Sequence, residues 1–178
     1  MSEQRVLLTL ILALAAAPAA AAESELGTHL RPALGTPAPA DYRSSASPDG
    51  TGLPAGSALV RDGEAIYAAQ CAACHGPDGQ LRGNALVGGQ GSLTGPAPVK
   101  TVGSFWPYAT TLFDYVDRAM PYGNAGSLSD DEVYAVTGWV LHLNGLMEPE
   151  DRVDAAALVE VRMPNRDGFL PLWPRAGD

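Results

Sequence analysis

Two cysteines, Cys71 and Cys74, stand three positions apart, and His75 directly follows the second. Two thiols one helical turn apart can reach the two vinyl groups on one edge of a porphyrin. The adjacent imidazole then lies under the ring, where one of its nitrogens can bind the iron. This spacing predicts one covalently attached haem c, held by Cys71 and Cys74, with His75 as an iron ligand.

Three other uses of the motif fit the sequence less well. A redox dithiol would leave His75 without a role, and no strand-to-helix pattern surrounds the cysteines. A structural zinc site needs four ligands, and the remaining histidines, His29 and His142, come with no second cysteine pair. A disulfide is possible, but it would close a very short loop and would therefore stabilise little. Haem attachment is the favoured interpretation.

The iron needs either a sixth ligand or an open site, and Met120 is the predicted ligand. Met120 follows a predicted helix and precedes a proline, in the loop before the next helix. A thioether ligand favours Fe(II) and raises the reduction potential. Met120 could instead fill a gap in the core, as methionine often does. The other candidates are Met147, Met163, His142 in a bis-histidine pair, and an open site.

The first residues have the pattern of a secretory signal. Arg5 supplies the basic region, residues 6–14 form a short apolar run, and Ala20–Ala22 supply small residues for cleavage. The apolar run is too short to span a bilayer. The expected location is therefore the periplasm, with no stable membrane insertion after cleavage. A retained N-terminal anchor is the alternative.

Helical patterns flank the cysteine–histidine motif. Residues 63–70 form a predicted helix, capped by Asp62, that runs into the motif. The strongest helical pattern begins at the capping box Ser129–Glu132 and stops at Gly145. Between them, residues 109–119 show a helical period, with an apolar face formed by Leu112, Tyr115, Val116 and Ala119. We expect an all-α fold, with about three to four helices packed around one haem that completes the core of a small domain.

The predicted boundaries divide the chain into four parts. Residues 1–22 are the signal peptide, and residues 23–58 are a Pro-, Ala- and Gly-rich extension, flexible or wrapped over the surface. Residues 59–147 form the haem domain, in which no helix is predicted between residues 76 and 103. Residues 148–178 form a tail with one weak helical patch. The tail either docks a partner or packs back on its own domain, through Arg162, Met163, Arg166 and Phe169.

The region from about 59 to 146 resembles the class I cytochromes c. Gly63 and Tyr67 match a glycine–aromatic pair that, in this family, lets the first helix cross the last one closely. Trp139 is the matching aromatic residue on the last helix. The stretch Gly-Asn-Ala-Leu-Val-Gly from residue 83 resembles a family segment in which proline is usual where Asn84 stands. The resemblance implies that the Asn84 carbonyl accepts a hydrogen bond from the ligand imidazole.

A narrower resemblance concerns sulfur chemistry. Residues 100–120, 128–143 and 161–169 resemble the SoxD-type cytochrome subunit of bacterial sulfur oxidation and related sulfite dehydrogenase cytochromes. The resemblance implies that the chain accepts electrons from a molybdopterin subunit that oxidises sulfite or protein-bound sulfane sulfur. It also implies a downstream acceptor, either a cytochrome or an oxidase. Some SoxD members carry two haems, whereas this chain has one attachment motif.

The predicted function is therefore single-electron transfer. No acid–base or nucleophilic constellation is recognisable, so the chain alone is not expected to be an enzyme. The net charge of −9 argues against nucleic acid, because binding phosphate requires a basic surface. Two alternatives remain: a freely diffusing cytochrome that delivers electrons to a terminal oxidase, and a haem sensor or catalyst with an open iron site.

Overall fold

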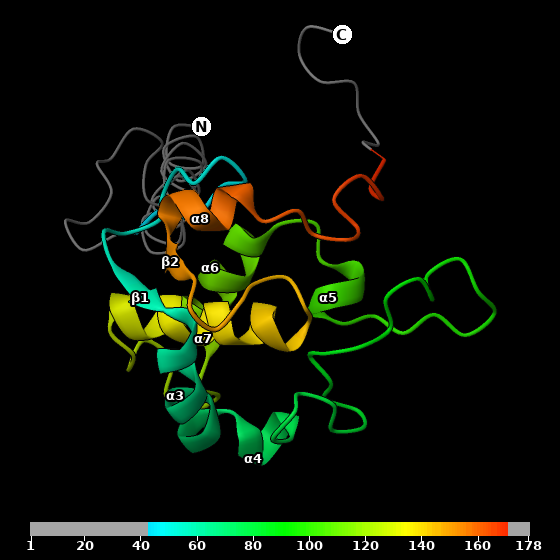
Figure 1. The fold of residues 1–178 in the computed structure, drawn as a ribbon, viewed down its shortest axis with the longest axis horizontal. Helices are drawn as coiled ribbons and strands as arrows, with labels where there is room; N and C mark the ends of the chain where they lie inside the picture. Colours follow the sequence, from blue (N-terminus) through cyan, green and yellow to red (C-terminus); the bar gives the residue numbers. More distant parts are fainter. Residues whose placement is uncertain (1–42, 171–178) are drawn as a thin grey trace, which may run out of the picture. The chain divides into compact units, whose positions relative to one another are not determined.

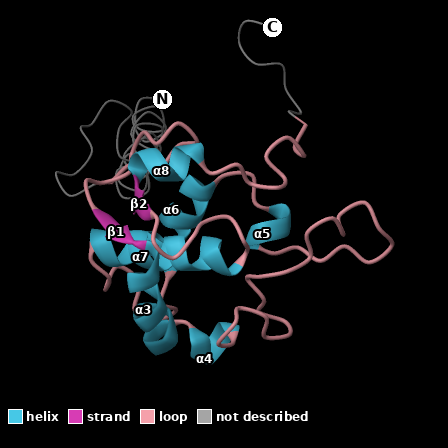
Figure 2. Cartoon of the chain, viewed as in Figure 1, coloured by secondary structure: helices cyan, strands magenta, loops and turns pink. Residues whose placement is uncertain are grey.

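Helices predominate in the computed structural model, which describes residues 43–170 (Figure 2). The predicted signal peptide, residues 23–42 of the predicted extension and the last eight residues lie outside the described residues. The elements follow one another along the chain (Figure 1) as β1 (Ser57–Leu59), the 3-10 helix η1 (Val60–Asp62), α3 (Gly63–Gln70), α4 (Ala72–His75), α5 (Val102–Phe105), α6 (Ala109–Ala119), α7 (Asp130–Leu143), β2 (Arg152–Asp154) and α8 (Ala155–Glu160).

Helix α7 is the centre of the described fold, and it packs against α3, α6, η1 and both strands. Its start is the predicted capping box: the Ser129 N–H donates to the Glu132 carboxylate at 2.8 Å, and the Ser129 hydroxyl accepts from the Glu132 N–H at 3.4 Å. An apolar stripe along α7 is buried at its first three positions and half-buried at the fourth. These positions are Val133, Val136, Val140 and Leu143. The capped helix is thus fixed at its start and enclosed along its length.

Helices α3 and α7 cross closely at Gly63. A Cβ atom at this position would lie 2.1 Å from the Ala135 carbonyl oxygen and 2.8 Å from the Cβ of Trp139. No larger residue fits this crossing without displacing backbone. The close crossing that the sequence resemblance implied for Gly63 and Trp139 is present, and it fixes the direction in which α3 leads into the cysteines.

Helix α6 has the predicted bounds but a different buried face. Leu112, Phe113 and Val116 are buried, whereas Tyr115 is half-exposed. The Tyr115 ring instead packs edge-on against Trp106, with the ring centroids 5.6 Å apart. The prediction that Tyr115 lies on the core-facing side was wrong, because this tyrosine is covered by a loop aromatic and not by another helix.

Two short strands join segments that were assigned to different parts of the chain. β1 pairs antiparallel with β2, so that Ser57 lies opposite Asp154 and Leu59 opposite Arg152. Val153 of β2, Leu158 of α8 and Met163 in the tail are all buried. The described ends of the predicted extension and tail therefore belong to the same packed unit as the predicted haem domain. The packed segment thus reaches beyond residues 59 and 147, through three-residue strands that show no readable alternation in the sequence.

The all-α prediction is confirmed, with two three-residue strands and the short helix α5 added to it. Among residues 43–170, none of the helices combines the length and the apolar character that crossing a bilayer requires.

Candidate haem-binding site

The two cysteines lie at the junction between α3 and α4. Cys71 ends the first helix and begins the second, and the Cys74 N–H donates to the Cys71 carbonyl at 3.1 Å. Both cysteines are free thiols; Cys71 is half-buried and Cys74 is exposed. The two sulfur atoms are therefore presented one helical turn apart, as the spacing predicts.

The Cys71 thiol is not activated for redox chemistry. Burial raises the pKa of Cys71, and the neighbouring Cys74 raises it further. A reactive dithiol needs the opposite shift, toward the thiolate. This environment argues against the redox interpretation and suits a thiol that is consumed once by covalent attachment.

His75 is oriented by a single strong contact. Its Nδ1–H donates to the Asn84 carbonyl oxygen at 2.8 Å. This bond fixes the tautomer and leaves the Nε2 lone pair available for a metal. The side-chain amide of Asn84 also donates to the Cys74 carbonyl at 3.0 Å, so Asn84 binds both the imidazole of His75 and the backbone of α4.

A buried tyrosine holds the turn that follows His75. The Tyr67 hydroxyl donates to the Gly76 carbonyl at 2.9 Å, and the Leu81 N–H donates to the His75 carbonyl at 2.9 Å. Gly76 adopts a φ of 84°, a left-handed conformation that favours glycine. Burial raises the pKa of Tyr67 to about 12, with smaller contributions from Cys71 and Asp78. The sequence resemblance singled out Tyr67, but its role as an anchor of this turn becomes visible only in the structure.

Met120 comes from a distant part of the chain. It caps the C-terminal end of α6, where its N–H donates to the Val116 carbonyl at 3.1 Å. Its partly buried side chain packs against the hydrophobic core, as do Cys71, Leu86 and Trp106. The structure thus places Met120 and the attachment segment against one common core, and iron ligation by Met120 stays a prediction.

The other candidate ligands have other contacts. Met147 and Met163 are buried in the core. The His142 Nδ1–H faces the Met147 carbonyl at 2.9 Å, and the imidazole ring packs against Trp139 with centroids 4.9 Å apart. Within residues 43–170, no three His, Cys, Asp or Glu side chains gather in a way that could hold a metal ion.

The apolar surface around the motif also fits a haem. Leu81, bonded through its backbone to His75, leaves 48% of its surface exposed. Leu86 and Trp106 are only partly buried. A flat apolar ring held by the two cysteines would cover side chains of this kind. The donor set fits a covalent haem as well: two free thiols, one oriented imidazole and one thioether.

Comparison with known proteins identifies similar chains. Residues 58–140 match the family model described as cytochrome C oxidase, cbb3-type, subunit III. The chain is 39% identical over 82 residues to a thiosulfate dehydrogenase of Allochromatium vinosum and 33% identical over 101 residues to one of Stutzerimonas stutzeri. These matches cover 44% and 55% of this chain but only 29% and 31% of the two relatives.

One solved structure is similar over more of its length. The crystal structure of the sulfane dehydrogenase SoxCD from Paracoccus pantotrophus matches with a TM-score of 0.72 and 43% sequence identity. The match covers 79% of this chain and 72% of that chain. It therefore extends beyond the segment that the family model covers.

Proposed function

The chain belongs to the class I c-type cytochromes and is of the SoxD type, and from this we propose that it is the electron-accepting subunit of a periplasmic, molybdopterin-containing sulfite or sulfane-sulfur dehydrogenase. The observation that carries the proposal is the 43% identity to the sulfane dehydrogenase SoxCD over 79% of this chain. On this proposal residues 1–22 direct export and are then removed. A retained N-terminal anchor would leave the same site in the same compartment.

The chain's own residues would hold one haem c. Cys71 and Cys74 would form the two thioether bonds, and His75 would bind the iron through Nε2 while Asn84 keeps its Nδ1–H engaged. Met120 would supply a thioether as a further iron ligand, which favours Fe(II) and raises the reduction potential. When bound, the haem supplies a one-electron Fe(III)/Fe(II) couple. The residues of this chain would set the reduction potential of that couple and would make no bond to the sulfur substrate.

Electrons would enter from the molybdopterin subunit and leave to a downstream cytochrome or oxidase. The chain's charge of −9 would steer it toward a positively charged partner surface. In the described part of the tail, Phe169 packs edge-on against Phe105, and the Asn165 amide donates to the Phe105 carbonyl at 2.7 Å. Residues 161–169 thus pack back on the domain, and any docking surface would combine them with α5.

Thiosulfate is a second candidate donor. Two thiosulfate dehydrogenases resemble this chain over part of its length, at 39% and 33% identity. The chain spans less than a third of either relative, so this similarity reaches only the electron-transfer module. On this alternative the haem and its ligands keep their roles, and the partner and the donor change.

The deciding experiment isolates the native protein gently from its host's periplasm and follows the haem absorbance after sulfite, thiosulfate or a sulfane-sulfur carrier is added. Fast reduction by sulfite or sulfane sulfur, together with a co-purifying molybdenum subunit, would support the main proposal. Reduction by thiosulfate alone would favour the alternative. The chain produced without its partner should be reduced by dithionite but by none of the three donors. If dithionite alone reduces the native preparation and no partner is bound, the chain is a freely diffusing carrier.

A further inference from the structure

The loop that carries Met120 has few internal contacts. This ligand loop (residues 120–129) runs from the C-cap of α6 to the N-cap of α7. Its middle, residues 122–127, is exposed, and Tyr122 is 91% exposed. Only Met120 and Leu128 of the loop pack against the hydrophobic core. The position of the Met120 thioether therefore depends on how firmly the two ends of the loop are held.

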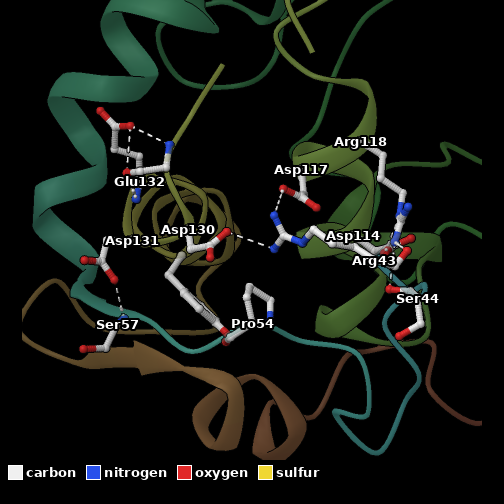
Figure 3. Close-up of polar contacts among 12 residues, drawn as sticks. Arg43, Ser44, Pro54, Ser57, Asp114, Asp117, Arg118, Asp130, Asp131 and Glu132 are labelled. Carbon is white, nitrogen blue, oxygen red and sulfur yellow. Dashed lines mark hydrogen bonds and ion pairs between the residues drawn. The ribbon is translucent and has the colours of Figure 1, made fainter. Parts of the chain in front are cut away.

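One guanidinium group joins those two ends (Figure 3). Arg43 Nη1 lies 3.3 Å from the Asp117 carboxylate, three residues before Met120, and Nη2 lies 2.9 Å from the carboxylate of Asp130, the first residue of α7. Arg43 is 74 and 87 positions away from these partners in the sequence. A planar guanidinium can serve two carboxylates at once, which a lysine ammonium does poorly.

The backbone around Arg43 is itself fixed to α6. We call residues 43–56 the strap. Arg118 donates to the carbonyls of Arg43 and Ser44 at 2.9 and 2.7 Å, and it pairs with Asp114 at 2.8 Å. Asp114 in turn accepts the Ala46 N–H at 2.9 Å. Arg43 therefore projects from a backbone that is already held in place.

This arrangement differs from an isolated surface ion pair. Such a pair contributes little to the free energy of folding, because both side chains lose conformational freedom and water screens the charges. Here the strap is ordered by the contacts of Arg118, and the side chain of Asp117 is only 13% exposed. The bridge is thus part of a charge network in which several partners share the cost of ordering.

We propose that Arg43 is a positioning residue for the axial ligand: by tying the end of α6 to the start of α7, it closes the ligand loop and keeps the Met120 thioether on the iron. The proposal rests on the proposed function, in which Met120 is the sixth ligand. Loss of the bridge would let the loop open more often, and an exogenous ligand could then compete for the iron.

The test uses the full-length, haem-loaded protein and its Arg43→Ala, Arg43→Lys, Met120→Ala and Arg162→Ala variants. Arg162→Ala is the control, because it also removes an arginine from an ion pair. Its partner is Asp167, and the side chains of Arg162 and Asp167 are both 78% exposed. The readouts are the Met–iron charge-transfer absorption of the ferric protein and the rate of carbon monoxide binding to the ferrous protein. Far-UV circular dichroism monitors the fold.

Carbon monoxide should bind Arg43→Ala at least about fivefold faster than wild type, which corresponds to about 1 kcal/mol of lost loop closure. Its ferric charge-transfer absorption should weaken, and Arg43→Lys should lie between Arg43→Ala and wild type. Arg162→Ala should match wild type, and Met120→Ala should mark the fully open site. Should Arg43→Ala fail to fold, Asp117→Asn, which keeps the side-chain shape, takes its place with the same expectation.

Two results would overturn the proposal, and they have different consequences. If wild type shows the charge-transfer absorption and slow carbon monoxide binding but Arg43→Ala behaves as wild type does, Arg43 does not position Met120 and the proposed function stands. If wild type already lacks this absorption and binds carbon monoxide as fast as Met120→Ala, Met120 is not the ligand. The axial-ligand part of the proposed function then falls together with the role of Arg43.

Discussion

Asn84 forms two hydrogen bonds that run in opposite directions, one with the predicted ligand His75 and one with the Cys74 carbonyl. Its carbonyl accepts from the His75 imidazole at 2.8 Å, and its amide donates to the Cys74 carbonyl at 3.0 Å. Its own N–H donates to the Leu81 carbonyl at 2.9 Å. In the resembling family a proline ring stiffens this turn. Here the asparagine side chain supplies the stiffness, by tying the turn to the helix that carries the motif.

Replacing Asn84 with alanine should raise the reduction potential. Alanine keeps the carbonyl but loses the bond to Cys74, so the carbonyl is held less firmly on the imidazole. A weaker bond from Nδ1–H lowers the basicity of the ligand and disfavours Fe(III). If the weaker hydrogen bond stabilises Fe(III) by about 0.5–1.4 kcal/mol less, the reduction potential of this one-electron couple rises by roughly 20–60 mV. Redox titration of the haem-loaded protein measures the shift.

Gln80→Ala is the control for Asn84, because Gln80 is an exposed neighbour in the same loop. Its potential should equal that of wild type. Equal reduction potentials in wild type and Asn84→Ala would mean that the backbone alone holds the Asn84 carbonyl in place. The hydrogen bond from the Asn84 side chain to Cys74 would then have no effect on the haem.

The sequence suggested the haem-attachment motif, and the family resemblance implied the bond between the Asn84 carbonyl and His75 that the structure contains. Neither indicated the side-chain bond of Asn84 or the Arg43 bridge. Cys71, Cys74 and His75 form a local pattern whose spacing carries the chemistry, so they could be named without a fold. The hydrogen bond from the Asn84 side-chain amide spans 10 positions of the chain, and the ion pairs of Arg43 span 74 and 87 positions. Their partners are set by how the helices pack, and no local pattern reports that.

At the scale of elements, the helices that could be predicted are those with a recognisable cap or with enough residues to show a helical period. Helices α6 and α3 have the predicted bounds, and α7 begins at its capping box. Helix α5 was missed because it has four residues, too few to show a period. Its cap is a mutual bond between Thr101 and Ser104 at 2.8 and 3.2 Å, without the acidic residue that usually marks such a box. Strands β1 and β2 exist only as a pair and left no signal in either segment.

The crossing of α3 and α7 predicts that Gly63→Ala is costly. The added methyl would lie 2.1 Å from the Ala135 carbonyl oxygen, so the two backbones must separate. Overpacking of this kind costs about 1–3 kcal/mol of unfolding free energy. Urea unfolding of the haem-loaded protein measures the loss. Gly95→Ala should cost less, because Gly95 is exposed and the added methyl would approach a single atom, the Ser92 carbonyl oxygen, at 3.2 Å. An equal loss in both variants would argue against a specific crossing.

A tyrosine on α7 forms a hydrogen bond with the C-terminal part of the strap. The Tyr134 hydroxyl donates to the Pro54 carbonyl at 2.8 Å, and the neighbouring Ser57 N–H donates to Asp131 at 2.8 Å (Figure 3). Burial raises the pKa of Tyr134 to about 12, with further contributions from Asp154 and Asp130, while Arg43 opposes them. The neutral phenol is therefore the form that the folded strap requires.

This raised pKa predicts a loss of stability at high pH. The folded state holds the Tyr134 proton more tightly than the unfolded chain, whose tyrosine has a pKa of about 10. The stabilisation is thus complete below pH 10 and is lost as the pH rises from 10 through about 12. Near pH 9, Tyr134→Phe should be less stable than wild type by about 0.5–1.5 kcal/mol, the net contribution of one hydrogen bond.

Urea unfolding at pH 9 and again near pH 11.5 checks this expectation, since the difference between wild type and Tyr134→Phe should shrink or reverse at the higher pH. Tyr122→Phe, at a highly exposed position, is the control and should match wild type at both values. A difference between wild type and Tyr134→Phe that stays constant with pH would show that Tyr134 does not titrate with unfolding.

At the scale of the whole molecule, charge sets which partners approach. The 20 acidic residues outnumber the 11 Lys and Arg residues, for a net charge of −9. Much of the acidic charge near the strap is neutralised by Arg43 and Arg118, which pair with Asp114, Asp117 and Asp130. Lys100 lies over the Phe105 ring of α5 at 4.8 Å, and Arg166 lies over the ring of Tyr108, the N-cap of α6, at 5.2 Å. The long-range field is thus acidic, with a local basic region beside the tail.

This field predicts how the reduced protein should react with small oxidants. A cationic oxidant should oxidise it at least about tenfold faster than an anionic oxidant of matched driving force, because the acidic field concentrates cations at the surface. Raising the salt from about 0.01 to about 1 M shortens the Debye length from about 30 to about 3 Å and should bring the two rates together. Stopped-flow absorbance of the haem gives both rates, and a neutral oxidant should show no salt dependence. A faster anionic oxidant would mean that the electron leaves through a locally basic surface such as that around Lys100 and Arg166, and the partner's matching face would then have to be acidic.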